Sequence, residues 1–317
     1  MTMTGYLKDG SGKRYELPLL TAWKMEYAAG VPCDSFWLQC PWEMGNEAVL
    51  EAAVRFEGVD GGKTVFTGVV DECQVTLSEA GRLLEVSGRS MAALLLDNEA
   101  LPADYMTLTT EDLLRNHVTP YGILVADRGA LPAVSGFSVT SGSSEWDVLY
   151  DFACYYGGIT PYFDRQGRLH LEGWGKGERR WTVDDSVPVT SLSYREKRYG
   201  VLSQVLVRDK TRQTVETVTD TAFYQSGGRC RRVITMPGKS HYKAMRFQGE
   251  YQIRKAKEER QTVTLTVPWG FAAWPGDRIA IQRSGWGNSG TFRVREAVVS
   301  LNGEQGAATQ LTLGTLE

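Results

Sequence analysis

Most of the chain alternates apolar and polar residues with a period of two, which is the pattern of half-buried β-strands. In the N-terminal part this alternation appears in TAWKMEY, DSFWLQC, LEAAVRFEG, KTVFTGVVDECQVTL and GRLLEVSGR, with turns such as KDGSG and GVDGG between them. It returns after residue 185, in stretches such as QTVTLTVPW, DRIAIQR and TFRVREAVVSL. Short strands with glycine-rich turns favour small barrels or sandwiches.

A period near 3.6 replaces this alternation in a few places. The clearest predicted helix is EWDVLYDFACYY, where Ser144 and Asp147 have the spacing of a capping box and Gly157-Gly158 ends the helix. Thr109 or Thr110 opens a shorter helix, EDLLRNHV. A further amphipathic helix is predicted near residues 242–259.

These changes of period predict three domains and a mainly β fold with an α+β insert. Residues 1–90 are expected to form a first small β-barrel-like domain, and residues 91–184 a compact α+β domain. Residues 185–317 are expected to form a second, similar barrel, which the helix near 242–259 interrupts.

The stretch GWGNSG, residues 285–290, has the glycine spacing of a dinucleotide-binding loop. That loop must join a buried strand to a helix whose N-terminus faces the phosphates. Here strand-like residues stand on both sides, and no acidic residue follows about 20 positions later. We therefore predict a hairpin turn and no nucleotide.

Composition narrows the class of protein further. A net charge of −3 and 42% hydrophobic residues are typical of a globular chain and not of a nucleic-acid binder with a basic stripe. The N-terminus lacks the apolar core of a signal peptide, and no apolar run is long enough for a membrane anchor. The five widely spaced cysteines favour reduced thiols in a protein made in the cytoplasm.

Residues that could do chemistry are few and scattered. His117, His170 and His241 have no second ligand at metal-binding spacing, so packed or surface positions are expected. Asp184 and Asp185 are adjacent, and adjacent side chains on an extended chain point opposite ways. They predict a turn and not a catalytic carboxylate pair. The sequence favours no enzyme, no cofactor and no metal.

Nine tryptophans leave several interpretations open. Trp269, Trp274 and Trp286 crowd into the C-terminal strands, and Trp174 and Trp181 flank a glycine-rich segment. They could cover the ends of barrels, form a contact with another protein, or stack on sugars.

Three stretches, in this order, resemble one family of proteins. The first runs from FTGVVD at Phe66–Asp71 to LEVSGRSMAALLLDNEA, in which Gly88-Arg89-Ser90 leads to Asp97. The others are SSEWDVLYDFACYYGGITPYFDRQGRLHLEGW and WPGDRIAIQ followed by GTFRVREAVVSLNGEQGAATQLTLG. Together they cover nearly the whole chain and resemble the tail hub proteins of phages and phage-like particles, the late-control D baseplate hub family with its PBSX-like members.

The resemblance implies a non-enzymatic structural protein. Its expected partners are two further copies of itself in a homotrimer, the tail tube protein, and baseplate or spike proteins. DNA would pass through the central channel without sequence-specific binding. The protein would be assembled in the bacterial host cytoplasm and reside in the virion tail. Trp269, Trp274 and Trp286 are then candidates for the contact with the tube or the neighbouring chain.

The sequence leaves two other functions open. A glycan- or receptor-binding tail-tip module would need several tryptophans on one exposed face, whereas a hub needs two similar barrels. A peptidoglycan hydrolase is the third class, because tail proteins sometimes include one.

Overall fold

Most strands of the protein belong to one large sheet. The computed structural model describes residues 3–30, 32–79, 81–173, 179–209, 214–237, 240, 242–258, 260–268, 273–303 and 306–315. Within these residues the main sheet has 13 strands, and three smaller sheets lie beside it.

The N-terminal strands form the first half of the main sheet. Their elements are β1 (Met3–Lys8), β2 (Arg14–Glu16), β3 (Ala22–Ala28), β4 (Ser35–Pro41), β5 (Arg55–Asp60), β6 (Lys63–Ser78) and β7 (Gly81–Ser90), with a short helix α1 (Glu47–Ala52) before β5. Burial alternates residue by residue along β1, β3 and β4. One face of each strand therefore packs into the core, as the period of two predicts.

The C-terminal strands form the second half. They are β13 (Arg180–Asp184), β14 (Ser191–Glu196), β18 (Gln261–Val267), β19 (Arg278–Gln282), β20 (Gly290–Asn302) and β21 (Gly306–Thr315). All neighbours in this half are antiparallel except β13 and β19, which are parallel.

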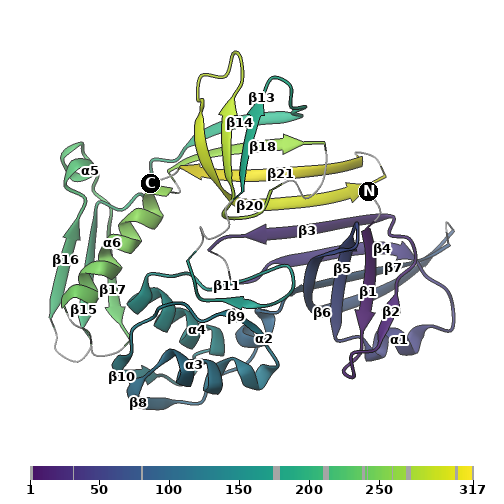
Figure 1. The fold of residues 1–317 in the computed structure, drawn as a ribbon, viewed down its shortest axis with the longest axis horizontal. Helices are drawn as coiled ribbons and strands as arrows, with labels where there is room; N and C mark the ends of the chain where they lie inside the picture. Colours follow the sequence, from purple (N-terminus) through teal and green to yellow (C-terminus); the bar gives the residue numbers. More distant parts are fainter. Residues whose placement is uncertain are drawn as a thin grey trace.

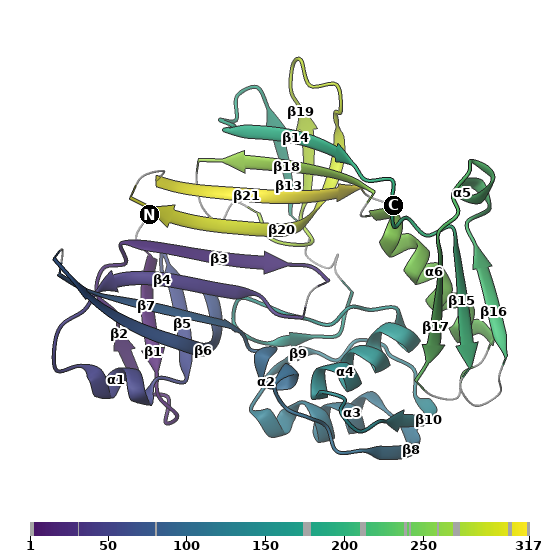
Figure 2. The same cartoon turned by 180° about the vertical axis from the view of Figure 1, so that it is seen from behind.

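The two halves meet where β3 pairs with β20. The strand order is β14-β18-β21-β20-β3-β4-β7-β6-β5-β1-β2, with β19 on β20 and β13 on β19. At the junction Met25 lies opposite Val299 and Trp23 lies opposite Leu301. Figures 1 and 2 show the N-terminal strands in purple below the yellow C-terminal ones, with the sheet curving between them.

The segment between the two halves folds into an α+β layer of its own. It contains α2 (Ala93–Leu96), β8 (Ala103–Leu108), α3 (Thr110–His117), the 3-10 turn η1 (Thr119–Tyr121), β9 (Val125–Asp127), β10 (Val134–Val139), α4 (Glu145–Tyr150), the π-helical turn η2 (Asp151–Tyr156), β11 (Tyr162–Phe163) and β12 (Leu169–His170). The predicted capping box at Ser144 and Asp147 is present, and Thr109 caps α3 through the backbone N–H of Asp112. The last turn of the predicted long helix has π-helical hydrogen bonds before Gly157 ends it.

A third layer lies within the residues expected for the second barrel. It consists of a three-stranded sheet, order β16-β15-β17, from β15 (Gln204–Asp209), β16 (Val215–Thr219) and β17 (Arg231–Met236), with the helices α5 (Thr221–Gln225) and α6 (Tyr242–Glu258). Met245, Gly249 and Ile253 of α6 are buried, as the sequence predicts. In Figure 1 this green layer stands apart from the yellow strands. The alternation of apolar and polar residues predicts these strands but does not predict which strands pair. The domain limits 1–90, 91–184 and 185–317 stay a prediction.

The buried side chains follow the same division. One core contains residues of both halves of the main sheet, a second lies in the α+β layer, and a third lies between α6 and its sheet. Trp23, Tyr27, Phe56 and Phe66 are among the largest fully buried side chains. The fold is thus mainly β, with two barrel-like groups of strands around an α+β insert, as expected from the sequence.

The stretch GWGNSG is a turn, which confirms the prediction. It connects β19 to β20, which pair as an antiparallel hairpin with Ile281 opposite Gly290. Gly285 has a φ of 75°, a conformation that side chains with a Cβ rarely adopt. The strand β20 follows this loop, in the place where a dinucleotide-binding loop would be followed by a helix.

Candidate assembly surface

Three tryptophans are the contact residues that the sequence proposes, and the structure describes two of them. Trp269 lies outside the described residues. Trp274 precedes β19 and Trp286 follows it, and both side chains are partly buried against the core of the main sheet. Their role in binding another chain stays a prediction.

Trp274 contacts two side chains from other parts of the chain. Its ring lies 4.5 Å from that of Tyr27 in β3, centroid to centroid. The guanidinium of Arg165, in the turn between β11 and β12, lies 4.4 Å from the centre of the Trp274 ring and 5.6 Å from that of Tyr27. The three side chains therefore join the N-terminal strands, the insert and the C-terminal strands at one point.

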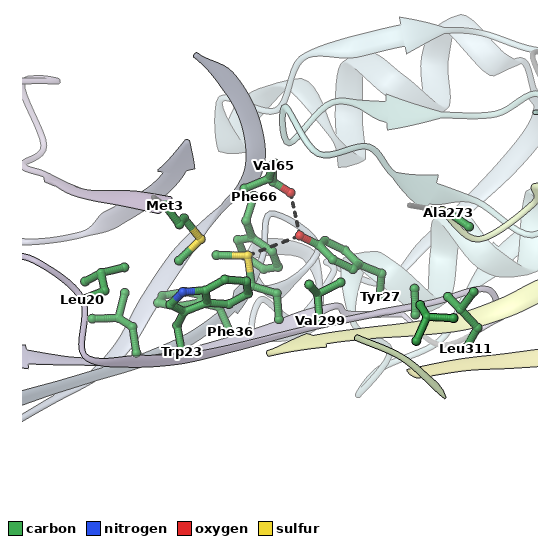
Figure 3. Close-up of a cluster of buried hydrophobic side chains, with 14 of the residues drawn as sticks. Met3, Leu20, Trp23, Tyr27, Phe36, Val65, Phe66, Ala273, Val299 and Leu311 are labelled. Atoms are coloured by element: carbon green, nitrogen blue, oxygen red, sulfur yellow. Dashed lines mark hydrogen bonds between the residues drawn. The ribbon is translucent and has the colours of Figure 1, made fainter. Parts of the chain in front are cut away.

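A hydrogen bond inside the core holds the side chain of Tyr27 in place. Its hydroxyl donates to the backbone oxygen of Val65 at 2.7 Å and contacts the sulfur of Met25 at 3.3 Å. Figure 3 shows the hydroxyl pointing toward Val65 among buried side chains from both halves of the sheet. Burial raises the pKa of the Tyr27 hydroxyl well above its usual range, so the group stays protonated. It acts as a hydrogen-bond donor inside the core.

Asp34 lies at the same junction. Its carboxylate accepts from the backbone N–H of Ala28 at 2.9 Å, and its own N–H donates to the hydroxyl of Ser90 at 3.2 Å. Although the residue keeps some exposed surface, desolvation of the carboxyl raises its pKa to about 7, against the effects of the Ala28 N–H and of Arg165. This carboxyl therefore titrates near neutral pH.

Arg89 links the first half of the sheet to the insert. Its guanidinium donates to both carboxylate oxygens of Asp71 in β6, at 2.7 and 2.9 Å. It also donates to both oxygens of Asp97, the residue after α2, at 3.0 and 2.7 Å. These hydrogen bonds hold the pKa of Asp97 below its usual range, against a smaller effect of burial. The Gly-Arg-Ser step and the later aspartate, which carried the resemblance, thus meet in one ion-pair cluster.

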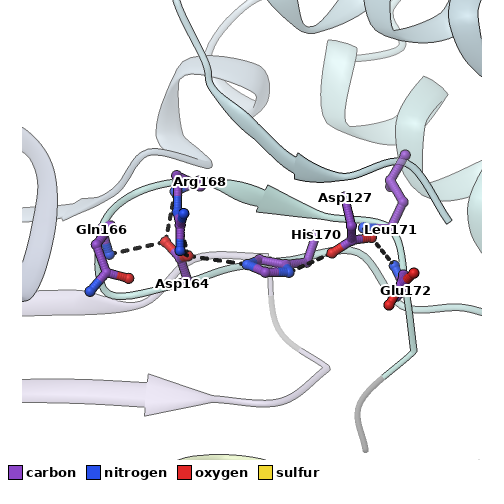
Figure 4. Close-up of polar contacts among 7 residues, drawn as sticks. All are labelled: Asp127, Asp164, Gln166, Arg168, His170, Leu171 and Glu172. Carbon is purple, nitrogen blue, oxygen red and sulfur yellow. Dashed lines mark hydrogen bonds and ion pairs between the residues drawn. The ribbon is translucent and has the colours of Figure 1, made fainter. Parts of the chain in front are cut away.

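His170 lies between two carboxylates of the insert. Its Nδ1 is 2.5 Å from Asp127 and its Nε2 is 3.1 Å from Asp164, as Figure 4 shows. Burial of the ring opposes protonation, but the hydrogen bonds and charges of both aspartates outweigh it and raise the pKa of His170. The stacked ring of Tyr162, 4.7 Å away, covers one face.

His117 has a similar setting in the core of the insert. Its Nδ1 is 2.6 Å from Glu145, and its Nε2 is 2.9 Å from the hydroxyl of Tyr105. The hydroxyl of Tyr121 donates to the other oxygen of Glu145 at 2.8 Å. Both described histidines thus use both ring nitrogens for partners inside the insert, so they connect its elements. His241 lies outside the described residues.

The sequence could not reveal these histidine partners, because they are distant along the chain. Asp127 lies 43 residues from His170, and Glu145 lies 28 residues from His117. Motif spacing finds pairs within a turn or two, not pairs that the fold brings together.

Asp184 and Asp185 form the turn that the sequence predicts. Asp184 accepts from the N–H and hydroxyl of Ser186, at 3.0 and 2.5 Å. Asp185 accepts from the N–H and hydroxyl of Ser284, at 3.0 and 2.5 Å. The two carboxylates stabilise two separate turns and do not face one bond.

A cleft lies between α6, the end of the insert and β20. Four cations line it, together with the carboxylate of Glu258: Arg254, Lys255, Arg293 and Arg295. Such a lining favours anions by its charge. In the described part of the chain, no group of three histidine, cysteine or acidic side chains could hold a metal ion.

None of the helices that the structure describes is long and apolar enough to cross a membrane.

Comparison with known proteins identifies the fold. No family model matches the sequence, and no curated protein does. Among solved structures, a tail protein from Neisseria meningitidis is similar with a TM-score of 0.80 and 19% identity, covering 99% of this chain and 96% of that one. The 43 kDa tail protein of prophage MuSo2 from Shewanella oneidensis has a TM-score of 0.74 and 16% identity, covering 98% of both chains.

A third similar structure belongs to a secretion system. It is the c3393 protein of Escherichia coli, a type VI secretion component described as similar to the T4 phage tail proteins gp27 and gp5. Its TM-score is 0.59 at 13% identity, covering 94% of this chain and 74% of that one. The chain therefore has the fold of these phage tail proteins.

Proposed function

We propose that this protein is the structural hub of a phage tail or phage-like contractile particle. Three copies form a ring that joins the tail tube to the baseplate or spike, and DNA passes through the central channel. The protein is assembled in the host cytoplasm and then resides in the tail of the particle. The protein acts by holding partners together and catalyses no reaction.

The observation that carries the proposal is an internal repeat in the strand order. The N-terminal strands run β1-β5-β6-β7-β4-β3, and the C-terminal strands run β13-β19-β20-β21-β18-β14. Each position thus has a counterpart with the same neighbours, although β1 is antiparallel to β5 whereas β13 is parallel to β19. Three such chains present six similar units, which suits a ring that meets a six-fold tube.

A bulge at the same place supports this correspondence. The pairing of β6 with β7 shifts register between Val70 and Glu72, and that of β20 with β21 shifts between Val294 and Glu296. Before these bulges, Arg55 of β5 lies opposite Val69, and Arg278 of β19 lies opposite Arg293. β-bulges are specific local features, so their coincidence favours two related units over a chance similarity.

The exposure of the tryptophans distinguishes the two candidate functions. Stacking on a glycan needs several exposed tryptophans on one face. Among the tryptophans that the structure describes, Trp181 is the most exposed residue, at 37%, and Trp274 and Trp286 are partly buried. This distribution favours the hub over a glycan-binding tip. Trp286, at the turn after β19, remains the candidate for a contact with the tube.

Native mass spectrometry of the purified protein tests the proposal. The expected species has three times the 35.2 kDa mass of one chain. Co-sedimentation with the tail tube protein should then move this trimer into the fraction that contains tubes. A protein that stays monomeric, both alone and with the tube protein, would rule out the ring.

A further inference from the structure

Among the edges of the main sheet without a strand partner in the described residues, two can be compared through the repeat, namely β14 and the last part of β6. β14 stands at the start of the strand order and pairs only with β18. Residues 72–78 of β6 pair with β7 on one side, whereas pairing with β5 on the other side stops at Val69. An unpaired edge offers backbone donors and acceptors to another strand.

The open edge of β6 carries exposed apolar side chains. Leu77 is 73% exposed and Val75 is 41% exposed. Counting from the shared bulge, their counterparts in β20 are Leu301 and Val299. Val299 is only 1% exposed, because β3 pairs with β20 there and Met25 lies opposite. The N-terminal unit therefore lacks the strand that covers these positions in the C-terminal unit.

We infer that β14 of one copy pairs antiparallel with residues 72–78 of β6 in the next copy. This inference rests on the proposed ring, and it specifies the contact that closes it. Within one chain β3 pairs with β20, and the repeat makes β14 the counterpart of β3 and β6 the counterpart of β20. The same contact, repeated around the ring, joins each chain to its neighbour.

The pairing within the chain also defines the register between chains. Met25 and Tyr194 are counterparts in the repeat. Met25 lies opposite Phe36, which lies opposite Gly88, and Tyr194 lies opposite Val263, which lies opposite Leu313. Gly88 and Leu313 correspond because each pairs with the last residue before the bulge, in β6 and in β20. Transferring the β3–β20 register then places residue 75 opposite residue 194 and residue 77 opposite residue 192.

The residues that this register brings together are chemically matched. Val75 and Leu77 meet Tyr194 and Leu192, which are partly buried and contact the same core. On the other face Thr76 meets Ser193, and both are exposed and polar. Apolar side chains thus face apolar ones on the inner face, and polar side chains meet on the outer face.

Within one chain β14 and β6 do not pair. Seven strand spacings separate them in the sheet order. Figure 1 shows β14 near the top of the molecule and β6 at the lower right. Each copy thus offers one edge of each kind, which is the head-to-tail association that closes into a ring when the rotation fits.

Disulfide trapping tests the register. We would combine Thr76→Cys with Ser193→Cys in a Cys73→Ser background and treat the protein with a mild oxidant. Directly opposite residues bring their Cβ atoms within reach of a disulfide, whereas residues two positions away do not. The matched control combines Thr76→Cys with Ser191→Cys, which is also an exposed serine on the same face of β14.

The expected result is a shift of the first variant to three times the monomer mass on a non-reducing gel, with the control remaining at monomer mass. Trimers by native mass spectrometry without this shift, or with an equal shift in the control, would overturn the inference and leave the proposed function intact. Monomers without cross-links would overturn both.

A charge substitution gives an independent readout. Leu77→Lys should abolish the trimer without loss of folding, because the side chain is exposed in the single chain. Met106→Lys is the control, since Met106 in β8 is 92% exposed and lies away from both edges. A Leu77→Lys protein that still forms trimers would contradict the contact.

Discussion

Replacement of Trp274 by alanine should destabilise the single chain before any effect on assembly. In the structure this side chain packs against Tyr27 and lies under the guanidinium of Arg165. It therefore belongs to the junction between the two halves of the main sheet and the insert. A tryptophan that served only to bind another chain could be truncated without loss of folding stability. Truncation of Trp274 should lower the stability of the single chain.

The expected loss of stability is the sum of the contributions from the contacts of Trp274. Removal of a fully buried tryptophan costs about 3–5 kcal/mol, so a partly buried one costs about 2 kcal/mol. Loss of the pair with Tyr27 adds about 1 kcal/mol, and loss of the cation–π contact adds about 0.5–1 kcal/mol. Trp274→Ala should thus lower the free energy of unfolding by about 3.5–4 kcal/mol, or about 1.2 M in the urea midpoint at a slope of about 3 kcal/mol per M.

Urea unfolding followed by far-ultraviolet circular dichroism measures this change. The matched comparison is Trp286→Ala, because this side chain is also partly buried against the core of the main sheet, and its indole N–H donates to the backbone oxygen of Asn288. Its loss should cost about 2 kcal/mol, the value for a partly buried tryptophan without the added contacts with Tyr27 and Arg165. A double-mutant cycle with Arg165→Met should give a coupling energy of about 0.5–1 kcal/mol between Arg165 and Trp274.

Equal losses of stability in the two tryptophan variants would refute this reasoning. So would a Trp274→Ala protein with normal stability that fails to form trimers, because Trp274 would then serve the interface between chains.

Three further changes test other parts of the structure. Burial raises the pKa of Asp34 to about 7, above its unfolded value of about 3.9. The free energy of unfolding should therefore fall as the pH rises from about 4 to about 7, because the folded protein binds this proton more tightly than the unfolded chain does. Asp34→Asn should flatten that part of a stability–pH profile. The raised pKa of His170 gives stability that is full below its unfolded pKa of about 6.5 and is lost as the pH rises through the folded value, so His170→Gln should cost more at pH 6 than at pH 9, as thermal melts would show. A Cβ at Gly88 would lie 2.0 Å from the backbone oxygen of Val69, so Gly88→Ala should cost about 1–3 kcal/mol in urea unfolding, whereas Gly10→Ala, with nothing within 4 Å, should not.

Local features of the chain were predictable from the sequence because they depend on neighbouring residues. The capping box at Ser144 and the buried face of the helix that ends at Glu258 follow from spacings of three or four residues. The turn at residues 285–290 follows from its glycines and from the alternation on both sides. The mainly β fold followed from the same alternation, and the resemblance of three stretches indicated the tail-protein class.

Which strands pair was decided only by the tertiary structure. A period of two shows which face of a strand is buried, but it is the same whichever neighbour the strand takes. The sequence therefore could not show that β3 pairs with β20, or that β15, β16 and β17 form a sheet of their own. The contacts of Trp274 and the meeting of Arg89 with two aspartates depend on this pairing, because they join segments far apart along the chain.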